Sequence, residues 1–96
     1  MAVILEHTDS TSKTGNMKGT VYKVNGDMIA LKVDENDFTI IEVSTDEFEV
    51  GEEVTWDADE GLGSGTVYNL SQDEEVDVMF QNHNVQNGQL AKQLTA

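Results

Sequence analysis

Residues 18–43 carry the clearest structural pattern in the chain, and they read KGTVYKVNGDMIALKVDENDFTIIEV. Short runs rich in valine, isoleucine, threonine and aromatic residues alternate with polar turns, which is typical of consecutive β-strands. Asn25-Gly26 separates the first two runs, and this dipeptide favours a tight hairpin because both residues tolerate a positive φ. The pattern predicts strands over residues 18–24, 28–33 and 38–43.

Alternation within these runs predicts which side chains face the core, because successive side chains of a strand point to opposite faces of the sheet. The predicted core-facing set is Ile29, Leu31, Val33, Thr39, Ile41 and Val43. The opposite faces carry the charged residues Lys32 and Glu42 and are expected to point outward. They remain unusually apolar for an outward face, because they also carry Met28, Ala30, Phe38 and Ile40.

Further strand signals follow along the chain. A fourth strand would place Val54, Trp56 and Ala58 on one face, with Trp56 as a core anchor. A fifth would run through Val67 and Leu70, and a sixth would direct Val76, Val78 and Phe80 to one side. Residues 44–49 are long enough for a helical turn. The tail from residue 81 is rich in asparagine and glutamine, with a short helix expected over residues 89–94.

The 96 residues suffice for one hydrophobic core and not for two. Residues 2–6 could form a short strand, and a polar stretch follows them. We therefore divide the chain into an N-terminal arm and linker, residues 1–16, and a barrel domain with a C-terminal tail, residues 17–96. The absence of cysteine excludes disulfides. Because no apolar stretch is long enough for a membrane span or a secretory signal, we expect a cytoplasmic protein with no membrane partner.

Charge is the most pronounced compositional feature, since 19 acidic residues face 5 lysines and no arginine, giving a formal net charge of −14. Nucleic-acid affinity comes largely from lysine and arginine, so this balance disfavours a nucleic-acid partner. Three readings of the acidity remain open: a solvated surface that keeps the protein soluble, as in a salty habitat, a surface for a basic protein partner, and a mimic of nucleic-acid charge.

Residue types that carry catalysis or bind metal do not form recognisable motifs. His7 and His83 lie in polar terminal segments, with no acidic residue at a catalytic spacing. The acidic turn before Gly61 lacks the glutamate that a calcium loop needs, because Val67 occupies its position. The glycine-rich residues 61–65 lack the lysine of a phosphate-binding loop. We therefore predict no enzyme activity, no metal and no cofactor, and we interpret Trp56, Tyr22 and Tyr68 as core or half-buried sheet residues.

Residues 17–71 resemble an oligonucleotide/oligosaccharide-binding (OB) barrel, and within that class a cold-shock domain. The similarity rests on Lys18-Gly19-Thr20-Val21, Asn25-Gly26, Val50-Gly51-Glu52-Glu53-Val54, and residues 61–67 followed by Asn69. The expected fold class is all-β, a small OB-like barrel of five to six strands with an N-terminal arm and a short C-terminal extension. A Tudor-like small barrel is the alternative, since it closes a sheet with similarly short strands.

The resemblance implies single-stranded nucleic-acid binding, but the residues that would perform it differ. Cold-shock domains stack bases on aromatic and histidine side chains of strands one to three, and each stacked base contributes roughly 1 to 3 kcal/mol. The corresponding positions here are Lys23, Met28, Ala30, Ile40 and Glu42. None of these is aromatic or histidine, so the activity of the family is not carried over to this chain.

The candidate binding face consists of Lys23, Met28, Ala30, Lys32, Phe38 and Ile40. An apolar patch of this kind is normally covered. Residues 2–5 or the C-terminal tail could cover it, or a second copy or another protein could bind there. We expect a non-catalytic protein-binding module that acts through this face or through its acidic exterior. The alternatives are weak single-stranded nucleic-acid binding centred on Lys23, Lys32 and exposed aromatic residues, and a purely structural or regulatory role.

Overall fold

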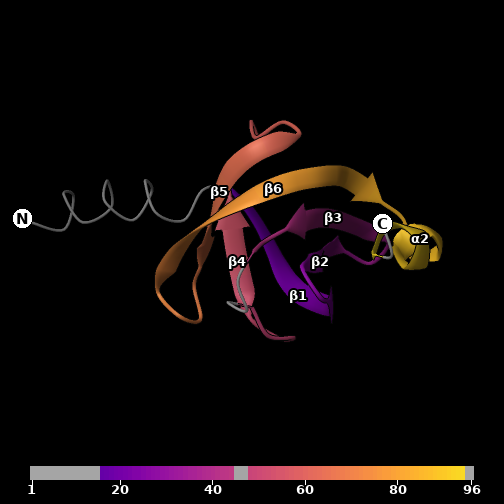
Figure 1. The fold of residues 1–96 in the computed structure, drawn as a ribbon, viewed down its shortest axis with the longest axis horizontal. Coiled ribbons are helices and arrows are strands. Elements are labelled where there is room, and N and C mark those ends of the chain that lie inside the picture. The colour runs from indigo at the N-terminus through magenta and orange to yellow at the C-terminus, as the bar shows by residue number, and fades with distance from the viewer. Residues whose placement is uncertain (1–15, 45–47, 95–96) are drawn as a thin grey trace, which may run out of the picture.

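The computed structural model describes residues 16–44 and 48–94 and shows six strands followed by a short helical segment (Figure 1). The elements are β1 (Met17–Asn25), β2 (Met28–Asp34), β3 (Asp37–Glu42), β4 (Glu53–Trp56), β5 (Gly63–Asn69), β6 (Glu74–Val85), the 3-10 helix η1 (Asn87–Gln89) and the α-helix α2 (Leu90–Leu94). The all-β class is thereby confirmed. The N-terminal arm expected over residues 1–16 lies almost wholly outside the described residues, as do residues 45–47 of the expected helical turn.

The strands close into a barrel in the order β1-β2-β3-β6-β5-β4, and every neighbouring pair is antiparallel. Two three-stranded meanders, β1–β3 and β4–β6, are joined by the pairings of β3 with β6 and of β1 with β4. This closed barrel is consistent with the OB-like class and has the larger of the two strand numbers expected. Within the described residues, no helix is long and apolar enough to cross a membrane.

The first hairpin forms as predicted, but its turn lies one residue later than expected. Asn25 is still paired with Met28, so that the two-residue loop is Gly26-Asp27. Gly26 has a φ of 63°, which is the backbone conformation that a two-residue hairpin with glycine at its first loop position requires. Asn25 is thereby left at the end of β1, where its side chain is available for another contact.

The barrel interior is filled by the side chains that the alternation selected. Ile29, Leu31, Ile41 and Val54 are all buried in one cluster. Trp56 is the predicted anchor, and its ring centroid lies 6.4 Å from that of Phe80. Ala58 does not join them, because β4 ends at Trp56 and Ala58 is exposed.

Strand β6 is longer than its sequence suggests. It extends over 12 residues, Glu74–Val85, although the stretch from residue 81 was assigned to the tail. Its first half pairs with β5 and its second half with β3. Asparagine and glutamine have little intrinsic preference for strands, so the pairing with β3 is what holds this part extended.

Candidate binding surfaces

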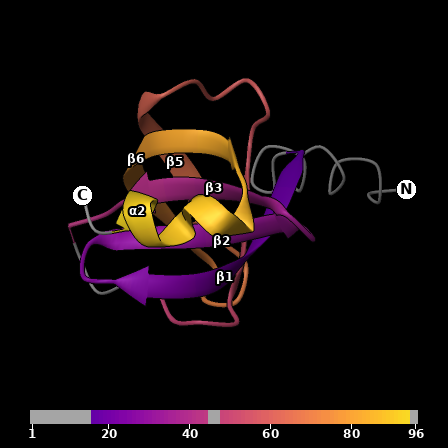
Figure 2. The same cartoon turned by 90° about the vertical axis from the view of Figure 1, so that its right-hand side faces the viewer.

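The barrel has a second, smaller core on its outside. Figure 2 shows α2 lying in front of β2 and β3. Leu90 and Leu94 of this helix belong to one buried cluster with residues of the sheet. The buried members of this outer core are Ala30, Phe38, Ile40, Val85, Leu90 and Leu94, with Met28 packed against them. The two leucines are four positions apart and so lie on one side of the helix. The C-terminal tail therefore covers the face of β2 and β3 that the sequence left open to several occupants.

The structure corrects the candidate binding face accordingly. Ala30, Phe38 and Ile40 are each 0% exposed, so they offer no surface to a partner while α2 is in place. Met28 and Lys32 are half-buried, and Lys23 alone of the candidate residues is exposed. Alternation placed these residues on the outer side of the sheet correctly. The prediction is wrong in assuming that side chains on the outer side of the sheet are accessible to a partner.

Hydrogen bonds from asparagine side chains fasten the helical segment at both ends. The Asn25 amide donates to the backbone carbonyl of Leu94 over 2.7 Å. At the other end, the Asn87 backbone N–H donates to Oδ1 of Asn36 over 2.7 Å. Asn25 ends β1, and Asn36 lies in the turn between β2 and β3. The side chains of these two residues therefore hold the helical segment against the first meander.

Tyr22 is exposed beside this covered face. The pairing of β1 with β2 shifts register between Val21 and Lys23, and a bulge of this kind redirects the side chain of the extra residue. Tyr22 is 43% exposed, its ring centroid is 5.1 Å from that of Phe38, and Lys32 Nζ lies 5.7 Å from its ring centroid. The interpretation of Tyr22 as a core or half-buried residue is therefore wrong. No feature of the sequence marks the bulge.

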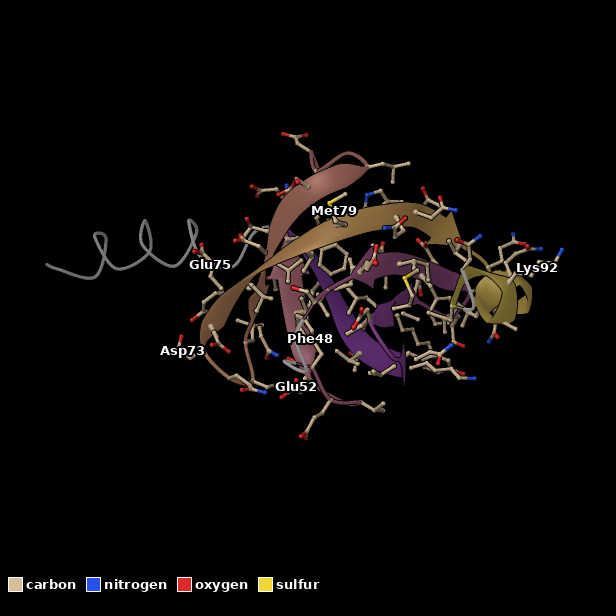
Figure 3. All side chains as sticks on the ribbon, in the orientation of Figure 1. Phe48, Glu52, Asp73, Glu75, Met79 and Lys92 are labelled. Atoms are coloured by element: carbon tan, nitrogen blue, oxygen red, sulfur yellow. The ribbon has the colours of Figure 1, made fainter. Side chains whose placement is uncertain are left out.

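An acidic depression lies where the two meanders join, over β3, β5 and β6. Its volume is about 340 Å³, and its walls include Asp27, Glu42, Ser44, Ser64, Asp77 and Met79. Glu42, Met79 and Ser64 form one row across the three strands, since Met79 pairs with both of the others. Met79 is 43% exposed, and Figure 3 places it on β6 beside β5. Among the described residues that line this depression, none is basic.

The carboxylates of the depression are held by neighbouring polar side chains. The amide of Gln81 donates to Glu42 Oε1 over 2.8 Å, and the hydroxyl of Thr66 donates to Asp77 Oδ1 over 3.4 Å. These contacts orient the acids without neutralising their charge. Within the described residues, no group of three or more potential ligand side chains is arranged to hold a metal ion.

A smaller cavity of about 210 Å³ lies at one end of the barrel, lined in part by Trp56, Thr39 and His83. His83 is part of β6 and not of a terminal segment, which corrects its assignment from the sequence. The Thr39 Oγ1 and His83 Nδ1 atoms are 3.2 Å apart. This pair links β3 to β6. Because Thr39 is only 2% exposed, the Thr39 hydroxyl is not accessible to a substrate. His7 lies outside the described residues.

Glu52, in the segment that leads into β4, is held by three hydrogen bonds to its carboxylate. Its oxygens accept hydrogen bonds from the Glu49 backbone N–H at 2.9 Å, from the Asn69 amide at 3.0 Å and from the Gln72 amide at 2.7 Å. Partial burial by itself raises the pKa of Glu52, but these three donors outweigh it and lower the pKa below the usual value. Figure 3 shows Glu52 at the base of the barrel, where it links the entry to β4 with the turn after β5.

Comparisons with known proteins add no further assignment. No protein-family model matches the chain, and neither a curated protein nor a solved structure matches it significantly.

Proposed function

We propose that the chain is a non-catalytic binding module that holds a basic segment of another protein in the acidic depression over β3, β5 and β6. The observation that carries this proposal is the combination of Asp27, Glu42 and Asp77 with an exposed Met79 in one concave surface. We also propose that the OB-like barrel is of the cold-shock-like kind and that the protein is cytoplasmic.

Charge and shape support a basic segment as the ligand. A concave surface lined by charges of one sign concentrates the opposite charge, and the chain as a whole carries a formal charge of −14. The thioether of Met79 adapts to apolar side chains of different shapes, as methionines do in promiscuous binding surfaces. An arginine or lysine with an apolar neighbour therefore matches both features.

Weak binding of single-stranded nucleic acid is the second candidate. It is favoured by Tyr22, which is 43% exposed and has Lys32 over its ring, together with the exposed Lys23. Aromatic and basic side chains in this combination can stack a base and contact its phosphate. The patch is small because α2 covers the neighbouring Phe38 and Ile40. The negative net charge of the chain also disfavours the binding of nucleic acid.

A peptide titration tests the proposal. The probe is a short synthetic peptide with two arginines flanking a leucine, and its control has glutamine at both arginine positions. We expect the arginine peptide to shift the amide resonances of Glu42, Ser64, Asp77 and Met79 selectively, and we expect this binding to weaken as salt is added. Shifts confined to Tyr22, Lys23 and Lys32 on addition of a labelled single-stranded oligonucleotide would favour the second candidate instead.

Charge-matched variants separate the depression from the acidic surface in general. Glu42→Gln with Asp77→Asn removes two charges from the depression, while Glu35→Gln with Glu75→Gln removes two exposed charges elsewhere. The first pair should weaken binding by about threefold to tenfold, because each partly exposed ion pair contributes up to roughly 1 kcal/mol. Equal weakening by the two pairs would reject a specific site.

A further inference from the structure

An Asn-Gly dipeptide lies at each end of the helical segment over residues 87–94, here called the cover. Asn25-Gly26 and Asn87-Gly88 are the only places in the sequence where glycine follows asparagine. The first lies at the hairpin between β1 and β2, and the second lies in η1. Asparagine before glycine loses its side-chain amide more readily than before other residues, because glycine has no Cβ to keep its backbone nitrogen away from the asparagine Cγ.

The two asparagines hold the cover through different groups. Asn25 uses its side chain, since its amide nitrogen donates to the Leu94 carbonyl over 2.7 Å. A carbonyl oxygen only accepts hydrogen bonds, so this contact requires a donor in the side chain at position 25. Asn87 uses its backbone N–H, which donates to Asn36 Oδ1. This second contact therefore does not depend on the Asn87 side chain.

We propose that Asn25 is a deamidation site and that its conversion releases the cover from the barrel. In this reaction the backbone nitrogen of Gly26 loses its proton and attacks Cγ of Asn25. A new C–N bond forms, and the side-chain nitrogen leaves as ammonia. Water then opens the resulting succinimide ring at either of its carbonyls, which gives aspartate or isoaspartate. The reaction involves no oxidation or reduction, and water is its only co-reactant.

Solvent reaches the reacting groups, but the cover restrains them. Asn25 and Gly26 are both exposed. While Leu94 accepts its hydrogen bond, the Asn25 amide is held by the helix and is not free to turn towards the Gly26 nitrogen. The α-helix of the cover has only five residues, and a helix this short is stable only through its packing. The reaction therefore proceeds from the molecules in which the cover has opened.

Either product lacks the hydrogen bond that holds the end of the cover. An ionised carboxylate has no hydrogen to donate, so two acceptors would face each other in place of the bond to Leu94. Isoaspartate also lengthens the main chain by one atom, which disturbs the pairing of Asn25 with Met28. Because hydrolysis in water does not restore the amide, the cover stays loosened. The buried side chains of Ala30 and Ile40 then become accessible.

Ageing of the full-length protein in mildly alkaline buffer tests the first step. Peptide mapping by mass spectrometry measures the conversion of Asn25 and of Asn87 in the same sample. We expect Leu94→Ala, which loosens the cover, to speed the conversion of Asn25 by at least about fivefold. Asn87 is the internal reference. Its conversion should change little, since Asn87 is exposed while the cover is closed.

Charge-matched variants test the second step. Asn25→Asp and Asn87→Asp each add one negative charge at an end of the cover, and Asp-Gly suits a tight hairpin as well as Asn-Gly does. Tryptic cleavage after Lys92, which is exposed on α2, requires local opening of the cover. We expect Asn25→Asp to speed this cleavage by at least about fivefold, the equivalent of one lost hydrogen bond. Asn87→Asp should leave it nearly unchanged.

Two results would overturn the proposal. If Asn87 were converted while Asn25 stayed intact in both the original protein and Leu94→Ala, the hairpin itself would prevent ring closure. If Asn25→Asp and Asn87→Asp were cleaved after Lys92 at equal rates, loss of the Asn25 amide would not release the cover.

Discussion

The side-chain amide of Asn25 donates a 2.7 Å hydrogen bond to the backbone carbonyl of Leu94, 69 positions later in the chain. The contact joins the first hairpin to the last turn of α2. It also sits at the border of the outer core, where Leu90 and Leu94 cover Ala30 and Ile40. The first meander and the end of the chain are therefore one packing unit, and the stability of that unit decides whether this face is ever exposed.

Truncation of either leucine should destabilise the protein measurably. Leu90→Ala and Leu94→Ala each remove a buried side chain from the outer core, and such changes cost about 2 to 5 kcal/mol in a well-packed site. Because α2 has only five residues and short peripheral elements open at a low free-energy cost, we expect about 2 kcal/mol in urea unfolding, the lower end of that range. Ala91→Ser, on the exposed side of the helix, is the control and should change little. A loss below about 0.5 kcal/mol in both leucine variants would show that the cover is not a stable part of the fold.

The barrel core could be predicted because it depends on local alternation. Ile29, Leu31 and Ile41 belong to runs in which every second residue is apolar, and a shift by one residue would turn all of them outward. A tight turn at Gly26 follows from the rarity of side chains at positive φ, although the loop is Gly26-Asp27 and not the expected Asn25-Gly26. These features need no knowledge of distant residues.

The surface could be predicted only in part, because it depends on contacts between distant segments. The apolar residues Met28, Ala30 and Ile40 indicated that something covers this face, and the C-terminal tail was one of the alternatives. Leu90 and Leu94 are the only large apolar residues after Val85 and lie four positions apart, but their local sequence does not indicate which face of the barrel they cover. The exposure of Tyr22 follows from a bulge in register with β2, and the row formed by Glu42, Met79 and Ser64 requires the order β3-β6-β5.

Gly65 should not tolerate a side chain. A Cβ atom at this position would lie 2.5 Å from Phe80 Cε2 and 2.7 Å from Glu60 Oε1. Phe80 is buried in the core and cannot move away without disturbing Trp56. We expect Gly65→Ala to lower the free energy of unfolding by about 1 to 3 kcal/mol, the usual range for overpacking.

Gly61→Ala is the matched control for this substitution. A Cβ atom at Gly61 would meet nothing within 4 Å, and Gly61 does not have a positive φ. This variant should be neutral or slightly stabilising, because alanine restricts the unfolded chain. Thermal unfolding of the two variants side by side gives the comparison. Equal stability of both would contradict the close packing of β5 against Phe80.

Glu52 should make stability depend on pH in the acidic range. Its folded-state pKa is lowered, so its carboxylate stabilises the fold above the unfolded-state pKa, and this contribution is lost as the pH falls through the folded-state value. Glu52→Gln should therefore flatten the decline of stability below about pH 4.5, the range in which an unperturbed glutamate titrates. At pH 7 the same variant should be less stable, because the buried Asn69 amide loses a charged acceptor. Chemical unfolding at several pH values measures both effects, with Glu75→Gln as an exposed control. An unchanged pH profile in Glu52→Gln would contradict the assignment.

Added salt should stabilise the protein, since the net charge of −14 makes the folded state repel itself. An opposing effect comes from the Lys18–Glu53 ion pair at 3.1 Å, which salt weakens. Both of its side chains are at least half exposed, and such pairs contribute only about 0.2 to 1 kcal/mol. Repulsion among many acids therefore outweighs the loss of this attraction. We expect the melting temperature to rise by roughly 4 to 8 °C, equivalent to about 1 kcal/mol, between about 0.01 and 0.5 M sodium chloride, as the screening length falls from about 30 Å to a few ångströms.

A variant with fewer charges separates screening from other effects of salt. Replacing Glu35, Glu49, Asp59 and Glu75 by their amides removes four exposed charges and leaves the barrel core and the acidic depression intact. Its melting temperature at low salt should be higher, and its rise with salt should be smaller. This result would support the reading of the acidity as an adaptation to salt-rich surroundings, in addition to any role in attracting a basic partner. If the variant and the original protein responded to salt identically, repulsion would not be the cause, because preferential exclusion of salt acts on both surfaces alike.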